Sequence, residues 1–135
     1  MIGKLDGRLL DSFLETIPIE FSIVDSDDKV AAWNKHETRT FKRPMAALGL
    51  DVHNCHPSKS VEKVERILAE MKDGSKDKAR FWIDIVDKGS GEKEKIMIEY
   101  YALRDGEGNY LGCLEASQRI GDIMQLKGEK RLLDL

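Results

Sequence analysis

The second half of the chain contains three consecutive stretches in which apolar and polar residues alternate. They are ARFWIDIV at 79–86, EKIMIEYYALRD at 94–105 and YLGCLEASQRI at 110–120. Alternation over this length is typical of β-strands with one face buried. The segment DGEGN at 105–109 favours a tight hairpin turn, because glycine and asparagine tolerate positive φ. The sequence therefore predicts three antiparallel strands as the largest part of the fold.

One strong helix precedes these strands. Its apolar positions recur every three or four residues and fall on one face: Val61, Val64, Leu68 and Met71, with Ile67 at the edge. Gly74 supplies a C-terminal stop, so the helix is expected over 59–73. Because an amphipathic helix must bury its apolar face, we expect it to pack against the sheet.

The first part of the chain predicts a short helix followed by a hairpin. In residues 6–16 leucine and phenylalanine recur at the spacing of a helix, and Pro18 is expected to end this helix. FSIVD at 21–25 and VAAWN at 30–34 flank an aspartate-rich turn, which is the pattern of a β-hairpin. Asn34 is then expected to cap a short helix over KHETRTF.

The composition is that of one globular domain. The 135 residues carry a net charge of −3 without a basic stripe, so nucleic-acid binding is not expected. No apolar run approaches the roughly 20 residues that span a bilayer, so no membrane partner is expected either. The amino terminus lacks the apolar stretch of a secretory signal, which makes the cytoplasm the expected location. Both cysteines, Cys55 and Cys113, are then expected as thiols.

Alternation also assigns the strand residues to two faces of the sheet. The set expected to face the helix is Phe81, Ile83, Ile85, Ile96, Ile98 and Tyr100, with Leu114 and Ala116. The set expected on the opposite face is Asp84, Glu99 and Glu115, together with Trp82, Met97, Tyr101, Leu103 and Leu111. This second face is too apolar to be left in water, so the N-terminal helix, a partner subunit or both should cover it.

The order of these elements resembles the PAS sensory domain. SIVDSDDKVAAWN resembles the opening PAS hairpin, whose second strand ends in an asparagine before short helices. ALGLDVHNCHP is similar to the glycine and His-Pro that precede the long helix in many PAS domains, and YLGCLEASQRIGDI to the last PAS strand. The aspartate that usually follows this strand is missing from its expected place, where 118–122 read QRIGD.

More narrowly, CHPSKSVEKVERIL, ARFWI, YALRDGEGNYLGCLEASQ and GEKRLLD resemble one bacterial and archaeal PAS subfamily. That subfamily is often found C-terminal to a domain of unknown function and a hemerythrin-like domain. The resemblance implies an α+β fold: a five-stranded antiparallel sheet with helices on its inner face and flanking terminal helices. It divides the chain into an N-terminal helical segment (1–18), a PAS core (19–120) and a C-terminal amphipathic helix (121–135).

The resemblance also implies a function, that of a non-catalytic sensory module within a larger cytoplasmic signalling protein. A small ligand would bind between the long helix and the sheet, and a homodimer would form through the terminal helices and the outer sheet face. The residues expected to line the pocket are Trp33, Val64, Leu68, Met71, Phe81, Ile83, Ile98 and Leu114. The same residues could instead form a solid core, which would leave a ligand-free dimerisation module.

The stretch HNCHP at 53–57 leads into the long helix. Some PAS domains hold haem between that helix and the sheet, and His56 is the best-placed axial ligand here, with His53 and Cys55 as alternatives. Familiar haem-binding PAS domains carry their histidine within the helix, which contains none in this chain. His56 could instead bond a loop or the start of the helix. Both interpretations of His56 stay open.

Other chemistries fit this stretch less well. A structural zinc site needs four ligands, usually as two separated pairs, and Cys113 could complete one only if its strand lay beside the stretch. A Cys/His nucleophile needs the two side chains to face each other beside an orienting acid, and adjacent residues rarely do so. The sequence has neither a glycine-rich phosphate loop nor a flavin signature.

Overall fold

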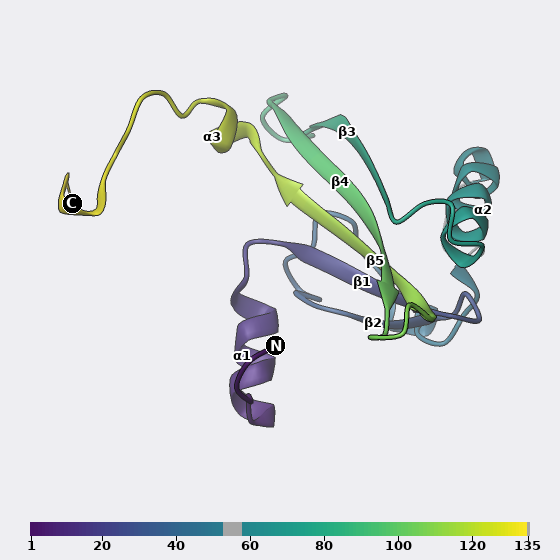
Figure 1. The fold of residues 1–135 in the computed structure, drawn as a ribbon. Coiled ribbons are helices and arrows are strands. Elements are labelled where there is room, and N and C mark those ends of the chain that lie inside the picture. The colour runs from purple at the N-terminus through teal and green to yellow at the C-terminus, as the bar shows by residue number, and fades with distance from the viewer. Residues whose placement is uncertain (53–57, 135) are drawn as a thin grey trace.

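A computed structural model describes residues 1–52 and 58–134 as an α+β fold built around one sheet (Figure 1). In chain order the elements are α1 (Gly7–Thr16), β1 (Glu20–Asp25), β2 (Val30–Trp33), η1 (Met45–Ala47), α2 (Ser58–Lys72), β3 (Lys78–Val86), β4 (Lys93–Arg104), β5 (Tyr110–Arg119), α3 (Gly121–Met124) and η3 (Leu132–Asp134). Five strands, each antiparallel to its neighbours, lie in the order β2-β1-β5-β4-β3. The expected five-stranded antiparallel sheet is confirmed.

The helix α2 packs against one end of the sheet and forms the apolar core there. Its buried residues Val64, Leu68 and Met71 contact Val24, Tyr100 and Cys113 of the strands. We call the sheet face that α2 covers the inner face, and this part of it the α2 end. Gly74 closes the helix at φ +85°, a backbone conformation that glycine adopts without strain.

The register of β5 differs from the prediction. Leu114 lies opposite Tyr101, and Ala116 lies opposite Glu99. Both side chains therefore point to the outer face, the one that α2 does not cover. Glu115 lies opposite Tyr100 and therefore points to the inner face. The expectation for these three β5 residues is wrong, because alternation separates the residues of a strand into two sets without deciding which set faces the helix.

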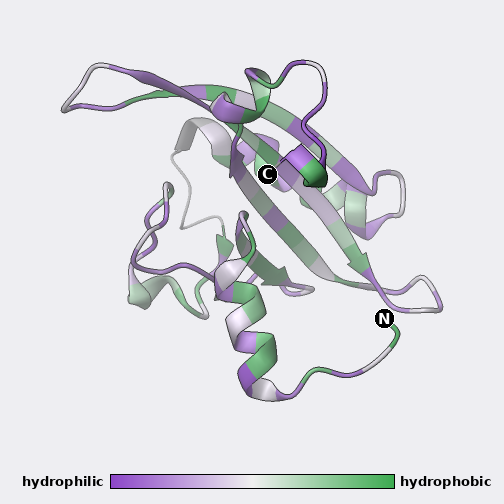
Figure 2. Ribbon diagram, turned by 90° about the vertical axis from the view of Figure 1, so that its left-hand side faces the viewer, coloured by the Kyte–Doolittle hydropathy of each residue, from purple (hydrophilic) through white to green (hydrophobic). Residues whose placement is uncertain are grey.

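The outer face is not covered by α1. Asp6 caps this helix, because its carboxylate accepts a hydrogen bond from Leu9 N at 2.8 Å, and no residue of the helix is buried. It stands apart from the sheet in both views (Figures 1 and 2), and the side chain of Phe13 is 50% exposed. On the sheet itself Trp82 is 63% exposed. The expectation that the N-terminal helix shields this face is therefore wrong, and a partner subunit stays a prediction.

The C-terminal segment is helical over a short stretch only. The helix α3 ends at Met124, and after it the chain runs away from the sheet to the short turn η3 (Figure 1). The expectation of an amphipathic helix throughout 121–135 is wrong beyond α3. Gly128 adopts φ +60°, which interrupts a helix, and Leu126 and Leu133 remain exposed without a surface to pack on. No helix in residues 1–52 and 58–134 has the length and apolarity to cross a bilayer.

Candidate functional site

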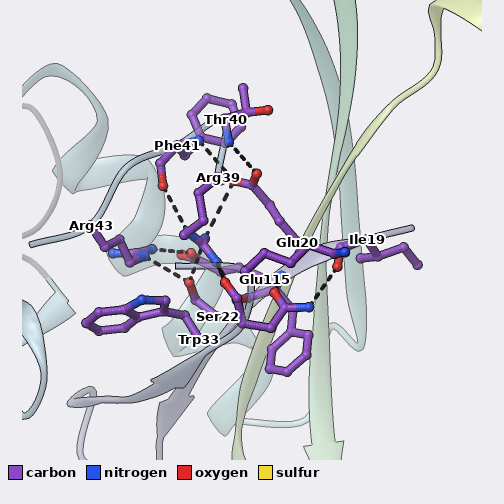
Figure 3. A network of polar contacts seen from close by, with 12 residues as sticks. Ile19, Glu20, Ser22, Trp33, Arg39, Thr40, Phe41, Arg43 and Glu115 are labelled. Atoms are coloured by element: carbon purple, nitrogen blue, oxygen red, sulfur yellow. Dashed lines mark hydrogen bonds and ion pairs between the residues drawn. The ribbon is translucent and has the colours of Figure 1, made fainter. Parts of the chain in front are cut away.

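A buried network of charged side chains occupies the inner face beyond the core (Figure 3). The sheet contributes Glu20 and Ser22 from β1 and Glu115 from β5. The segment that follows β2 contributes Arg39 and Arg43, which pair with these carboxylates. Charges this deep are tolerated only when paired and hydrogen-bonded, because desolvation is costly. We call this part of the inner face, together with Ile96, Ser117 and Arg119 beside it, the loop end.

Arg39 is the centre of the network and is only 5% exposed. Its guanidinium donates hydrogen bonds to the carbonyl oxygens of Phe21, Asn34 and Phe41 at 2.9, 2.9 and 3.0 Å. It also lies 3.6 Å from a carboxylate oxygen of Glu20. Burial lowers the pKa of Arg39, and the charge of Glu20 opposes that effect. The guanidinium also donates to the Ser22 hydroxyl at 3.2 Å, so each of its nitrogens has a partner within the protein, which is a structural role.

The same bonds explain why the expected helix over 35–41 does not form. The carboxylate of Glu20 accepts hydrogen bonds from the backbone N–H groups of Thr40 and Phe41, at 2.6 and 3.0 Å. Together with Arg39 it satisfies backbone groups that a helix would pair internally. A single turn, with Thr38 N bonded to Lys35 O at 3.0 Å, is what remains of the helical pattern.

Asn34 joins the N-terminal helix to the sheet instead of capping a helix. Its side-chain oxygen accepts a hydrogen bond from Phe21 N at 2.7 Å, and its amide nitrogen donates to Leu14 O and Ile19 O at 2.6 and 2.9 Å. The residue is 2% exposed. One buried amide thus fixes the end of α1, the linker after it and the start of β1.

A second ion pair links the loop end to the core. Arg43 donates to Glu115 at 2.7 Å and to the Ser22 hydroxyl at 2.8 Å, and the side chains of the ion pair are each 11% exposed. Burial, and then the neighbouring Glu115 carboxylate, raise the pKa of Tyr100. Burial also raises the pKa of Cys113, to about 12. Both groups stay protonated at neutral pH, so Cys113 is not a thiolate nucleophile.

Two adjoining cavities open at the loop end. The larger, of about 280 Å³, lies between the α1–β1 linker, the turn after β2 and the end of β5. The smaller, of about 160 Å³, lies over the neighbouring ends of β3 and β4. Thr40, Ile96 and Arg119 line both. Residues that lie far apart in the sequence therefore surround these two small cavities, with charged and hydroxyl groups set among apolar ones.

The structure separates the eight residues expected to line a pocket. Val64, Leu68 and Met71 are buried in the core at the α2 end, and Ile98 packs against it. Phe81 and Ile83 lie on the inner face of β3 but are 38% and 40% exposed. Leu114 lies on the outer face. Trp33 lies opposite Ser22 on β2 and donates from Nε1 to His36. None of the eight lines either cavity described above.

The haem candidates His53, Cys55 and His56 lie outside the described residues. The one histidine within them, His36, is exposed, and its Nδ1 accepts the hydrogen bond from Trp33 at 3.0 Å. In residues 1–52 and 58–134 no group of three or more His, Cys, Asp or Glu side chains is arranged to hold a metal ion. Haem and zinc at HNCHP therefore stay predictions.

The residues of the loop end were missed by reasoning from the sequence. Glu20, Arg39 and Arg43 occupy positions where a charge normally faces water, so composition alone gives no signal. Glu115 carries a weak signal. If Leu114 and Ala116 face outward, the acid between them points to the inner face, where it needs a cationic partner.

Comparison with known proteins agrees with this architecture. Residues 10–121 match the model of a PAS domain family. The C-terminal domain of a Streptococcus mutans protein has a similar structure, with 28% identity, a TM-score of 0.83 and 94% of each chain covered. The PAS domain of a protein from Colwellia psychrerythraea gives 14% identity and a TM-score of 0.60 over 85% of this chain and 97% of that one. A sensory box sensor histidine kinase from Vibrio cholerae has 15% identity and a TM-score of 0.53, over 83% of this chain and 89% of that one. No curated protein matches the chain. The family match spans most of the sequence, and the chain belongs to the PAS domain family.

Proposed function

We propose that this chain is a sensory PAS module whose small ligand binds at the loop end of the inner face and alters the position of α1. PAS domains are typical of sensory signal transduction, and a neighbour in structure is described as a sensor histidine kinase. One observation carries the proposal: the larger cavity is lined by Pro18 and Ile19, the linker that carries α1. A molecule in this cavity would contact the sheet and the linker at once.

The contacts around the linker are suited to transmit such a change. Asn34, which directly follows β2, donates hydrogen bonds to Leu14 O and Ile19 O. Lys35 donates from its backbone N to the Glu15 carboxylate at 2.7 Å and from Nζ to Glu15 O at 2.9 Å. Lys35 also lines the cavity. A ligand that displaces this residue would loosen α1, provided that it binds one arrangement of the linker better than the other.

The output surface is proposed to be a homodimer interface formed by the terminal segments and the outer sheet face. The apolar side chains that α1 and the C-terminal segment leave in water include Leu9, Leu10, Phe13, Ile123 and Leu126. Trp82 on the outer sheet face is exposed as well, and exposed apolar side chains are typical of protein–protein interfaces where they form a continuous patch. The module is proposed to act within a larger cytoplasmic signalling protein of the subfamily that accompanies hemerythrin-like domains, and to have no catalytic role of its own.

Haem with His56 as its axial ligand stays a proposal. The exposed side chains of Phe81 and Ile83 on the inner face offer an apolar wall, which a porphyrin requires. A hemin titration followed by visible spectroscopy tests it. We expect a Soret band that is lost in His56→Ala and kept in His36→Ala, and an unchanged spectrum would exclude haem.

The sensory proposal is tested by hydrogen exchange of α1. Protein purified natively is compared with protein stripped of small molecules by unfolding and refolding, before and after addition of the protein-free small-molecule extract of the expressing cells. We expect the amides of residues 9–19 to exchange at a rate that depends on the extract. Ser117→Phe, which fills the larger cavity, should abolish the response, and Ser90→Phe on the exposed β3–β4 turn should keep it. The same exchange rate in every sample would overturn the proposal.

A further inference from the structure

We infer that the loop-end cavities bind a small zwitterion of the free α-amino acid class, with its carboxylate at Arg119 and its ammonium group at Glu94. The inference deepens the proposed sensory function and rests on it for its biological meaning. It starts from charges of opposite sign that line the same cavity of about 160 Å³, with Arg119 on one side and the acids Glu94 and Asp87 on the other.

Arg119 has donors available for a carboxylate. Arg119 is exposed, and its Nε donates to the Thr40 hydroxyl at 3.1 Å, which orients the guanidinium. Within residues 1–52 and 58–134 no ion pair involves it, and its two terminal nitrogens have no hydrogen-bond partner there. A guanidinium held in this way binds a carboxylate through two parallel hydrogen bonds. The other cation of the site, Lys35, is already engaged with Glu15.

Glu94 is the matching acid. It is half-buried, lies opposite Ile85, and its carboxylate rests against the backbone of Gly121, where an added Cβ would come within 2.8 Å of it. In the described part of the chain this carboxylate has neither a hydrogen bond nor an ion pair. Asp87 lines the same cavity, and the backbone N–H of Gly89 and, more weakly, the charge of Arg119 lower its pKa. Its carboxylate accepts the hydrogen bond from Gly89 N at 2.7 Å, however, and so holds the β3–β4 turn. Glu94 is therefore the acid that remains for a ligand cation.

The surroundings limit the size and the charge of the ligand. Ile85 and Ile96 form the apolar floor between the two charges, and the Thr40 and Ser117 hydroxyls border it. Volumes of about 160 and 280 Å³ lie below the roughly 300 to 1,000 Å³ typical of drug-sized ligands. A simple carboxylic acid would satisfy Arg119 and leave Glu94 unpaired, and an amine would do the reverse. A molecule with both groups satisfies both.

Calorimetric titration tests the inference with glycine, L-alanine and L-serine as probes, and with propionate and ethylamine as single-charge controls. We expect saturable binding of at least one amino acid and much weaker binding of both controls. Arg119→Gln and Glu94→Gln should each weaken that binding by about tenfold or more, the scale of one charge-assisted contact. Arg131→Gln and Glu92→Gln, both on exposed residues, should leave it unchanged.

The outcomes separate the inference from the function on which it rests. Equal binding of propionate and the amino acids, or no binding of any amino acid, would overturn the zwitterion. If the extract still changes the exchange of α1 in that case, the sensory function stands and only the ligand class is wrong. Amino-acid binding without a change in α1 would instead support the inference and contradict the coupling.

Discussion

The two ends of the inner face are built from the same strands but by different physical means. At the α2 end, Met71 and Cys113 are fully buried, and the core is closed by apolar contacts. At the loop end, the equivalent space is filled by Arg39, Arg43 and the carboxylates that pair with them, beside two open cavities. The α2 end is specified by burial of apolar area, and the loop end by hydrogen bonds and ion pairs between its buried polar groups.

This difference indicates where a PAS module of this kind can change state. A packed apolar core resists displacement, since moving any side chain opens a cavity. A polar network has alternative partners, because a ligand or water can replace a hydrogen bond that the protein loses. We therefore place rigidity at the α2 end and responsiveness at the loop end, and the following substitutions are chosen to separate the two.

The largest loss of stability is expected for Arg39→Met. The substitution leaves the Glu20 carboxylate and three backbone carbonyls without their buried partner. Removal of one member of a buried ion pair costs about 3 to 5 kcal/mol. Urea denaturation of this variant and of Arg80→Met, whose ion pair with Glu99 is on the exposed edge strand, measures the difference. Equal stabilities would show that the network does not hold the loop.

A comparable loss, for a different reason, is expected for Met71→Ala. This side chain is 0% exposed, so truncation leaves a cavity at the α2 end and costs about 2 to 5 kcal/mol. Its effect on the response of α1 to the small-molecule extract should be small, in contrast to substitutions at the loop end. Hydrogen exchange of α1 in this variant checks that contrast. Loss of the response in a folded Met71→Ala protein would break the division between the two ends.

Asn34→Ala should cost about 2 kcal/mol, because it leaves buried backbone groups of Leu14, Ile19 and Phe21 unpaired. The effect should be local, with faster exchange in α1 and an unchanged core. Asn109→Ala, on the exposed β4–β5 turn, is the control and should cost less than about 1 kcal/mol. Uniformly faster exchange in both variants would argue against a specific clamp on α1.

High pH offers a test of the closed α2 end. Burial raises the pKa of Cys113 from 9.0 to about 12, so above pH 9 the unfolded chain loses a proton that the folded chain keeps. The free energy of unfolding should then fall as pH rises from 9 to 12, with a slope approaching about 1.4 kcal/mol per pH unit for one group. Cys113→Ala should remove this part of the slope, while Tyr110, whose pKa is also raised to about 12, contributes in both proteins. Identical slopes would mean that the thiol is not sealed from water.

The smallest effect on stability is expected for Phe13→Glu. The side chain is half-exposed, so the free energy of unfolding of the monomer should change by about 0.5 kcal/mol or less. If α1 forms the proposed homodimer, the variant should nevertheless become monomeric in sedimentation or light scattering, while Ser12→Glu, on the same exposed helix, remains dimeric. A wild-type protein that is monomeric at all concentrations tested would contradict the proposed homodimer interface.

Sequence patterns predicted the elements far better than the site. Alternation over 79–120 and the helical face of Val64, Leu68 and Met71 were sufficient for the sheet and for α2, because both depend on local periodicity. The face of Leu114 and Glu115 was assigned wrongly, because Glu115 on the inner face pairs with Arg43, which is 72 residues away along the chain. The cavities could not be predicted either, since they are formed by segments that periodicity does not bring together.

The most direct test of the division between the two ends is a map of amide chemical shifts. Spectra of the labelled protein are recorded with and without the small-molecule extract of the expressing cells. The account predicts shifts at Ile19, Thr40, Ser117 and Arg119 and in α1, and almost none at Val64 or Leu68. Shifts confined to the α2 end, or none anywhere, would contradict the claim that the loop end is where this PAS domain senses its ligand.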